Sequence, residues 1–143
     1  MISGKTKVCG IIGDPIEHTM SPAMHNAAFA HLGLDFCYVP FRVKAENLAQ
    51  AVAGIRALNI RGVNVTIPHK VSVIPLLDKV DQLAQKIGAV NTIVNDGSVL
   101  SGYNTDAAGF LSALHSVGLE PKGKRVVVLG AGGAARAITF ALA

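Results

Sequence analysis

Short runs of apolar and β-branched residues alternate along the chain with segments whose apolar residues recur at helical spacing, a pattern that predicts strands separated by helices. The predicted strands are residues 7–13, 35–43, 61–65, 90–94, 99–103 and 125–129; the predicted helices are residues 21–32, 48–58, 106–117, 134 onward, and two short helices within 71–87. Strands that alternate with helices are typical of an α/β protein whose mostly parallel sheet carries helices on both faces. We therefore expect that fold class, followed by the first strand, turn and helix of a Rossmann-type domain.

Local signals support several of these boundaries. Ser21 followed by Pro22 is typical of a helix start, with Ser21 as the N-cap and Pro22 at the first helical position. Gly33 follows the end of that helix. The sequence Asn95-Asp96-Gly97 between two β-rich runs predicts a tight hairpin turn.

The end of the chain contains only the beginning of a second unit. A dinucleotide-binding domain needs several more strands and a ribose-reading residue roughly 20 positions after its glycines. We divide the chain into a substrate-binding domain (1–103), a linker helix and loop (104–120) and the truncated start of a dinucleotide-binding domain (121–143). We therefore expect a fragment of a longer protein, in which the strand and helix after Lys124 lack covering partners from their own domain.

Composition narrows the class of protein. Half of the 143 residues are hydrophobic and 15% are charged, which is ample for a buried core. No run of Lys and Arg exceeds two residues, so the net charge of +4 does not indicate a nucleic-acid partner. The sequence contains no stretch of about 18 apolar residues, the length that would predict a membrane-spanning helix. Cys9 and Cys37 lie in apolar runs, which predicts buried free thiols and a cytoplasmic protein. The five histidines have no metal-ligand partner set, so we expect no metal site.

Clusters of polar side chains follow several predicted strands. The segment Asn64-Val65-Thr66-Ile67-Pro68-His69-Lys70 places an amide, a hydroxyl and an amine around a proline that excludes regular helix or central strand. Similar clusters are Ser21-Pro22 with His25-Asn26, then Ala89-Val90-Asn91-Thr92, and then Gly102-Tyr103-Asn104-Thr105-Asp106. Because α/β proteins bind ligands at the ends of strands, these clusters predict a site for a small polar substrate.

A glycine-rich turn predicts a dinucleotide beside that substrate. Gly130-x-Gly132-x-x-Ala135 follows a valine-rich strand and begins a helix, as the dinucleotide-binding pattern requires. Gly130 allows a tight turn, Gly132 allows a pyrophosphate to approach the backbone, and the N-terminus of the helix favours the phosphates. The alternative is a plain tight turn.

Lys70 and Asp106 are the candidates for proton chemistry. A lysine ammonium can hand a proton to a carbonyl oxygen, and a nearby carboxylate would hold that ammonium in place. The alternatives are a surface lysine and a helix N-cap, and the spacing alone does not bring the two residues together. His69 is another candidate acid, but we expect its ring to point away from Lys70 or to solvent.

These motifs resemble those of the shikimate dehydrogenases. The similarity covers the whole chain and rests on motifs that stand in the family's order: Gly13-Asp14-Pro15-Ile16 with His18-Thr19-Met20-Ser21-Pro22, Asn64-Val65-Thr66-x-Pro68-x-Lys70, Gly88-Ala89-Val90-Asn91-Thr92, Gly102-x-Asn104-Thr105-Asp106, and Gly130 to Arg136. The resemblance implies the reversible reduction of 3-dehydroshikimate to shikimate by NADPH in aromatic amino-acid biosynthesis, and it makes residues 121–143 the start of an NADP-binding domain.

The resemblance also assigns roles to single residues. It implies Lys70 and Asp106 as the catalytic pair, Thr19 and Ser21 on the substrate carboxylate, and Asn64, Thr66, Asn91 and Asp106 on the ring hydroxyls, with Lys70 also in contact with substrate. Gln82 would approach the cofactor, and Gly130, Ala131, Gly132, Gly133 and Ala134 would cradle its pyrophosphate. Thr19 stands where the family usually has serine, which leaves the discrimination between shikimate and quinate open.

Three alternatives stay open at this point: a quinate/shikimate dehydrogenase that uses NAD, a non-catalytic domain that binds shikimate-like acids, and a dehydrogenase of the same layout acting on another substrate, such as a folate. A pure binder needs no proton donor, so Lys70 together with Asp106 favours an enzyme. As partners we expect the small-molecule substrate, no nucleic acid and no membrane, and we allow for a homodimer.

Overall fold

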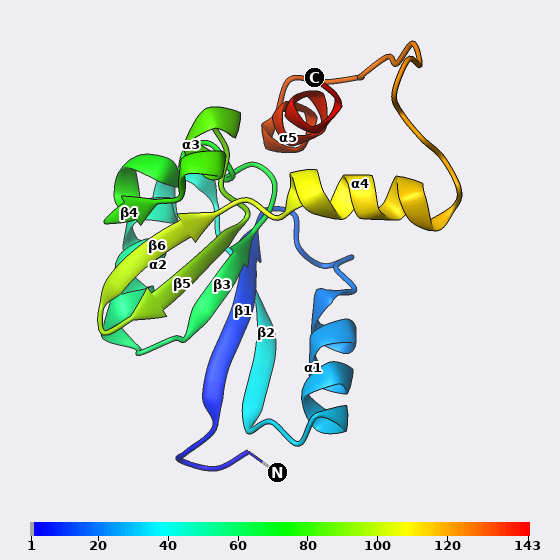
Figure 1. The fold of residues 1–143 in the computed structure, drawn as a ribbon. Helices are drawn as coiled ribbons and strands as arrows, with labels where there is room; N and C mark the ends of the chain where they lie inside the picture. The colour runs from blue at the N-terminus through cyan, green and yellow to red at the C-terminus, as the bar shows by residue number, and fades with distance from the viewer. Residues whose placement is uncertain (1) are drawn as a thin grey trace.

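The computed structural model describes residues 2–143, in which six strands form one sheet. The strands are β1 (Lys7–Gly13), β2 (Phe36–Arg42), β3 (Gly62–Val65), β4 (Lys79–Val80), β5 (Thr92–Asp96) and β6 (Val99–Tyr103), in the order β2-β1-β3-β5-β6-β4. The pairs β1–β2, β1–β3 and β4–β6 are parallel, whereas β5 is antiparallel to β3 and β6. The predicted α/β fold with a mostly parallel sheet is therefore confirmed (Figure 1).

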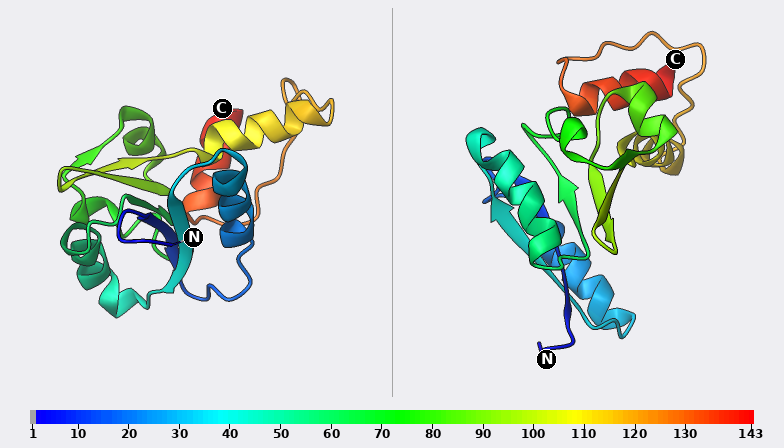
Figure 2. Two further views of the ribbon diagram at one scale, coloured as in Figure 1. Left: turned by 90° about the horizontal axis from the view of Figure 1, so that it is seen from below. Right: turned by 90° about the vertical axis from the view of Figure 1, so that its left-hand side faces the viewer.

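Helices cover both faces of this sheet because neighbouring residues of a strand point to opposite sides. Ile11 of β1 is buried with Phe29 of α1 (Ser21–His31), whereas Ile12 is buried with Ile55 of α2 (Leu48–Ala57). Figure 2 shows the sheet between these two helices. The start of α1 differs slightly from the prediction: its N-cap is Met20, and Ser21 is already helical.

The segment from residue 71 to 87 differs from the prediction of two short helices. It contains a 3₁₀ turn, η2 (Ile74–Leu76), then strand β4, and only then α3 (Gln82–Ile87). A second 3₁₀ turn, η1 (Ala45–Asn47), precedes α2. Asp78 lies just before β4, and its side chain accepts hydrogen bonds from the Leu100 N–H of β6 (2.7 Å) and from Arg56 of α2 (2.7 Å). Residues 79–80 therefore adopt a strand conformation because they pair with β6, which lies about 20 residues later in the sequence.

The hairpin between β5 and β6 is confirmed, with a small shift of its turn. β5 continues to Asp96, and the two turn residues are Gly97 and Ser98, which both have positive φ (58° and 75°). Two residues with positive φ are the geometry that matches the twist of a two-residue hairpin.

The predicted strand at residues 125–129 is wrong. These residues have no regular structure, and Val127 and Leu129 are 84% and 93% exposed. A strand needs a neighbour to accept its backbone hydrogen bonds, and the described residues offer none here.

The helix that follows, α5 (Gly133–Leu142), packs on elements that lie outside its own predicted domain. Ala137 is fully buried against Ile87 of α3 and Ala107 of α4 (Asp106–Ser116), and Arg136 Nη1 donates to the Gly88 carbonyl (3.2 Å). Figure 1 shows α5 lying across α4 beside α3, while Phe140 remains 40% exposed.

The outer edge of β2 has an unusual arrangement. The Asp35 carbonyl and the Val43 N–H bond to β1, so the alternate residues, Tyr38 and Pro40, direct their backbone groups away from the sheet. Asn26 of α1 takes up both groups of Tyr38: its Oδ1 accepts from the Tyr38 N–H and its Nδ2 donates to the Tyr38 carbonyl, each at 2.9 Å. Pro40 has no N–H to offer.

Candidate functional site

Lys70 lies on a turn that the surrounding structure holds firmly. β3 ends at Val65, and the His69 N–H then closes the turn on the Thr66 carbonyl (2.9 Å). The His69 ring is 1% exposed and its Nε2 lies 2.6 Å from the Val43 carbonyl. The ring is therefore anchored inside the protein, and the expectation that it could reach solvent is wrong. Pro68 and this anchored ring fix the backbone immediately before Lys70, and the Lys70 carbonyl accepts from the Val90 N–H (2.7 Å).

Lys70 and Asp106 meet across 36 positions of sequence. Lys70 Nζ lies 2.6 Å from Asp106 Oδ2, with the two side chains 17% and 26% exposed. Asp106 is the first residue of α4, whose N-cap is Thr105, so Asp106 is not itself the cap. The Asn104 side chain accepts from the Asp106 N–H (3.0 Å) and thereby fixes the start of this helix. The lysine is thus a partly buried cation held on a preorganised carboxylate.

Asn91 connects this pair to the rest of the site. Its Nδ2 donates to Asp106 Oδ1 and to Thr105 Oγ1, both at 2.8 Å. Its Oδ1 accepts from the Thr105 N–H and from Thr92 Oγ1, both at 3.0 Å. Because Asn91 is only 9% exposed and uses both ends of its amide, it holds the second oxygen of Asp106 in one orientation.

The remaining predicted substrate residues are all half-buried and differ in how directly they connect to this centre. Thr66 lines the same cleft as Lys70. Asn64 donates to Thr92 Oγ1 (3.2 Å), next to Asn91. Thr19 Oγ1 accepts from the Ser21 N–H (3.3 Å), but among residues 2–143 neither side chain bonds to Lys70 or Asp106.

The glycine-rich turn lies directly against the lysine. A cleft of about 420 Å³ is lined by Thr66, Lys70, Gly130, Gly132 and Gly133, among others. Gly130 has φ of +121°, a conformation that favours glycine, as predicted for the tight turn. A side chain at Gly130 or Gly132 would meet nothing within 4 Å, whereas one at Gly133 would approach Lys70 Cβ to 2.6 Å.

The residues of this turn fit a bound pyrophosphate. Open space faces Gly130 and Gly132, and Gly132 is the N-cap of α5, whose free N–H groups favour an anion. Gln82, the other predicted cofactor residue, is exposed at the first position of α3 and does not line this cleft. No group of three or more His, Cys, Asp or Glu side chains within residues 2–143 is arranged to hold a metal ion. Over the same range, no helix has the length and apolarity needed to cross a bilayer.

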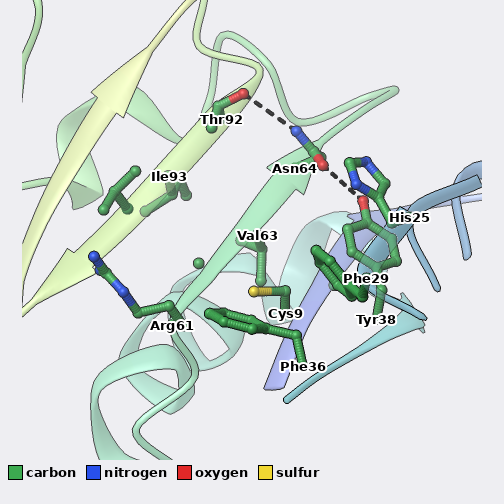
Figure 3. Close-up of a pocket in the computed structure, with 13 residues that line it drawn as sticks. Cys9, His25, Phe29, Phe36, Tyr38, Arg61, Val63, Asn64, Thr92 and Ile93 are labelled. Atoms are coloured by element: carbon green, nitrogen blue, oxygen red, sulfur yellow. Dashed lines mark hydrogen bonds between the residues drawn. The ribbon is translucent and has the colours of Figure 1, made fainter. Parts of the chain in front are cut away.

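Tyr38 is a residue that the sequence did not single out. Its hydroxyl donates to Asn64 Oδ1 (2.7 Å), and Figure 3 shows this contact in line with the one from Asn64 to Thr92. Burial raises the pKa of Tyr38 to about 12, and the nearby Ser21 hydroxyl opposes that shift. An aromatic residue within an apolar strand resembles any core residue, so the sequence held no signal for this contact.

His25 and Asn26, grouped at first with the polar clusters, support Tyr38. The His25 ring stacks on the Tyr38 ring with centroids 4.3 Å apart and an interplanar angle of 12°. Asn26 holds the Tyr38 backbone, as described above. Their position beside Ser21 in sequence therefore reflects the packing of α1 on β2.

Comparison with known proteins relates this geometry to a family. The profile of the shikimate dehydrogenase substrate binding domain matches residues 11–93. A protein of Moorella thermoacetica named shikimate dehydrogenase (NADP(+)) is 55% identical over 142 residues, which make up 99% of this chain and 48% of that relative. The chain spans about half the length of the curated relatives it matches.

Solved structures agree with this similarity. A Listeria monocytogenes shikimate 5-dehydrogenase in complex with shikimate and NAD has a TM-score of 0.89 and 47% identity, over 99% of this chain and 49% of that one. A ligand-free 5-ketofructose reductase of Gluconobacter sp. strain CHM43 has a TM-score of 0.85 and 44% identity, over 98% of this chain and 50% of that one. With a profile match over more than half of its length and close relatives along nearly all of it, the chain belongs to the shikimate dehydrogenase family, whose substrate-binding domain it contains.

Proposed function

We propose that the protein catalyses the reversible, NADPH-dependent reduction of 3-dehydroshikimate to shikimate. In this proposal the chain supplies the substrate-binding domain and the beginning of the cofactor site, and it is part of a polypeptide as long as its relatives. We call that polypeptide the whole protein. The observation that carries the proposal is the Lys70–Asp106 pair, which lies in one cleft with the glycine-rich turn.

Lys70 is the proton donor of the proposed reaction. As hydride reaches the carbonyl carbon, negative charge develops on the carbonyl oxygen, and a positioned ammonium can donate a proton to it. Asp106 holds the ammonium at 2.6 Å, and Asn91 holds the opposite oxygen of Asp106. In the oxidation direction, the same nitrogen accepts the proton of the shikimate hydroxyl.

The other predicted residues provide recognition. Amide and hydroxyl groups of Asn64, Thr66 and Asn91 would bind the ring hydroxyls, and Thr19 and Ser21 would bind the carboxylate. A site built from such groups rejects analogues that lack a hydroxyl, since each missing partner leaves a buried polar group unpaired.

NADPH, when bound, supplies the hydride. Gly130, Gly132 and the N-terminus of α5 would hold its pyrophosphate, because they offer open space and free backbone N–H groups beside Lys70.

Two related activities remain as candidates. The Listeria relative was crystallised with NAD, which keeps a quinate/shikimate dehydrogenase using NAD in consideration. The 5-ketofructose reductase has the same fold at 44% identity, so the domain also occurs with a different ketone substrate.

A comparison of substrates and cofactors tests the proposal. The whole protein should oxidise shikimate with NADP with a kcat/KM at least about tenfold higher than with quinate or with NAD, since about 1.4 kcal/mol of discrimination suffices for that ratio. Equal or better activity with quinate and NAD would favour the first alternative. Activity confined to 5-ketofructose would favour the second, and binding without any turnover would contradict an enzymatic role.

We further propose a cytoplasmic location and a homodimer. Cys9 and Cys37 are half-buried and not fully buried as predicted, and their free thiols support a reducing compartment. Fractionation of cells that produce the tagged whole protein tests the location, and light scattering coupled to size-exclusion chromatography tests the oligomeric state.

A further inference from the structure

Tyr38 lies where the cavity beneath α1 meets the candidate site. This cavity of about 400 Å³ is lined by Tyr38 together with Phe29, Phe36, Val63 and Asn64, among others (Figure 3). Tyr38 is 3% exposed, and its position is fixed by the stacked ring of His25 and by the Asn26 side chain on its backbone. Its hydroxyl therefore occupies one defined place beside Asn64.

Hydrogen bonds run without interruption from Tyr38 to the catalytic pair. The Tyr38 hydroxyl donates to Asn64, the Asn64 amide donates to Thr92, and the Thr92 hydroxyl donates to Asn91. Asn91 in turn donates to Asp106, which holds Lys70. This series of hydrogen bonds thus links β2, β3 and β5 to the start of α4.

The direction of each of these bonds follows from one fixed donor. The Thr105 backbone N–H can only donate, so the Asn91 atom that faces it is the amide oxygen. The Thr92 hydroxyl also donates to that oxygen, so its own oxygen is free to accept a hydrogen bond from the Asn64 NH₂ group. This places Asn64 Oδ1 toward Tyr38, whose hydroxyl must then be the donor.

We infer that Tyr38 is a positioning residue for substrate recognition: its hydroxyl fixes the amide of Asn64 so that the second lone pair of Oδ1 accepts from a ring hydroxyl of the substrate. The inference rests on the function proposed above and deepens it. Ser21 approaches the same hydroxyl, so Tyr38 also lies between the predicted carboxylate-binding and hydroxyl-binding groups.

The decisive variant is Tyr38→Phe in the whole protein. Phenylalanine keeps the ring and its stacking on His25 but removes the donor, so Asn64 loses one of the contacts that fix its orientation. We expect the KM for shikimate to rise about tenfold, the effect of one hydrogen bond of about 1–1.5 kcal/mol. We expect kcat to change less than about threefold, because Tyr38 makes no contact with the proton donor, and the KM for NADP and the pH profile of kcat to stay unchanged.

A double-mutant cycle separates this role from general destabilisation. If Tyr38 acts through Asn64, then Tyr38→Phe should add almost nothing to the KM of an Asn64→Ala protein. Tyr103→Phe is the matched control: it removes the hydroxyl of the chain's other tyrosine, which is 40% exposed on β6, and should leave both kinetic constants unchanged. Additive effects of Tyr38→Phe and Asn64→Ala, or a wild-type KM in Tyr38→Phe, would overturn the inference and leave the proposed function intact.

A measurement that does not need turnover distinguishes failure of the proposed function from failure of the positioning role of Tyr38. If the whole protein does not act on shikimate, the proposed function fails and the substrate role of Tyr38 fails with it. The NMR resonances of the Asn64 side-chain amide still test its orientation by Tyr38. They should shift in Tyr38→Phe and stay in place in Tyr103→Phe, and unshifted resonances in both variants would contradict the hydrogen-bond chain itself.

Discussion

Lys70 is the residue on which the proposed chemistry depends most directly. Its ammonium contacts Asp106 at 2.6 Å in a partly buried setting, on a turn that the buried His69 ring holds in place. Among residues 2–143, no other lysine side chain forms a salt bridge, so this ion pair separates Lys70 from the remaining lysines.

Replacing Lys70 with alanine should reduce kcat of the whole protein by about 10²- to 10⁴-fold, the usual contribution of a positioned acid or base. The KM for shikimate should change much less, because most recognition groups remain. Steady-state kinetics in both directions measures this effect, and Lys122→Ala, an exposed lysine in the loop after α4, is the control. A kcat within a few-fold of wild type would assign the proton transfer to another group.

Some residues of the candidate site could be identified from the amino-acid sequence, and others could not. Lys70, Asn91 and Asp106 could be identified because polar types stand at strand ends, where an apolar core offers no other reason for them. Their mutual contacts could not be derived, because the pairing of β3 with β5 brings together positions that the spacing leaves independent. The hydrogen bond from Tyr38 to Asn64 could not be predicted at all, because Tyr38 differs from a core phenylalanine only in its hydroxyl group.

At the scale of elements, Asp78 joins three segments. Its carboxylate accepts from the Leu100 N–H of β6 and from Arg56 of α2, next to the short strand β4. These two hydrogen bonds, the first more than the second, lower the pKa of Asp78. A carboxyl whose pKa is lower in the folded state stabilises the fold above its unfolded pKa of about 4, and that contribution disappears as the pH falls through the lowered value.

The Asp78→Asn variant should therefore melt at a lower temperature than wild type at pH 7. The difference in melting temperature should shrink as the pH falls below about 4, where the wild-type carboxyl also becomes protonated. Thermal unfolding followed by circular dichroism from pH 2 to 8 tests this, with Asp96→Asn at the exposed hairpin end as control. A difference that is constant over the whole range would mean that the charge of Asp78 is not what stabilises this edge.

The start of α5 depends on a glycine that touches the lysine. A Cβ at Gly133 would lie 2.6 Å from Lys70 Cβ and 3.3 Å from Ala89 Cβ. Lys70 Cβ is attached to a fixed turn and cannot swing aside, so the first turn of α5 must move instead. Gly133→Ala should therefore weaken the packing of α5 on α3 and α4.

Hydrogen exchange of the α5 amides measures that packing. We expect faster exchange in Gly133→Ala and no such change in Gly109→Ala, where the added methyl of α4 meets nothing within 4 Å. The Gly109 variant should even be more stable by about 0.5–1 kcal/mol, as for alanine in a helix interior. Unchanged exchange in Gly133→Ala would show that this contact does not hold α5.

Strands and helices with a repeated apolar pattern were predicted to within a few residues, whereas elements that depend on distant partners were not. β4 forms because Asp78 and Lys79 lie beside β6, and no strand-like apolar run at this position predicts it from the sequence. Residues 125–129 have the composition of a buried strand but no neighbouring strand, so the same pattern stays irregular.

For the whole molecule, the division into residues 1–103, 104–120 and 121–143 stays a prediction. The chain spans about half the length of its curated relatives, and in the cleft beside Lys70 the glycine-rich turn is the group that we expect to hold the pyrophosphate. We expect it to bind shikimate weakly, to bind NADP undetectably and to catalyse no turnover.

Calorimetric titration with NADP and with shikimate, together with a dehydrogenase assay, tests the isolated chain. The whole protein under the same conditions is the control, and it should bind both ligands. Clear binding of NADP by the 143-residue chain would mean that the turn at Gly130 to Gly133 and the cleft beside Lys70 supply most of the cofactor contacts.

The outer edge of β2, with Asn26 bonded to Tyr38 and a proline at position 40, affects how copies of this protein can associate. An open edge strand is a template on which another chain can continue the sheet, and such growth leads to polymers. Here Asn26 already occupies the donor and acceptor of Tyr38 as a neighbouring peptide group would, and Pro40 withholds the next donor. An incoming strand would find both backbone groups of Tyr38 occupied and no N–H at Pro40. We therefore expect that no strand continues the sheet through the middle of β2, and that copies of this protein, where they associate, use another surface.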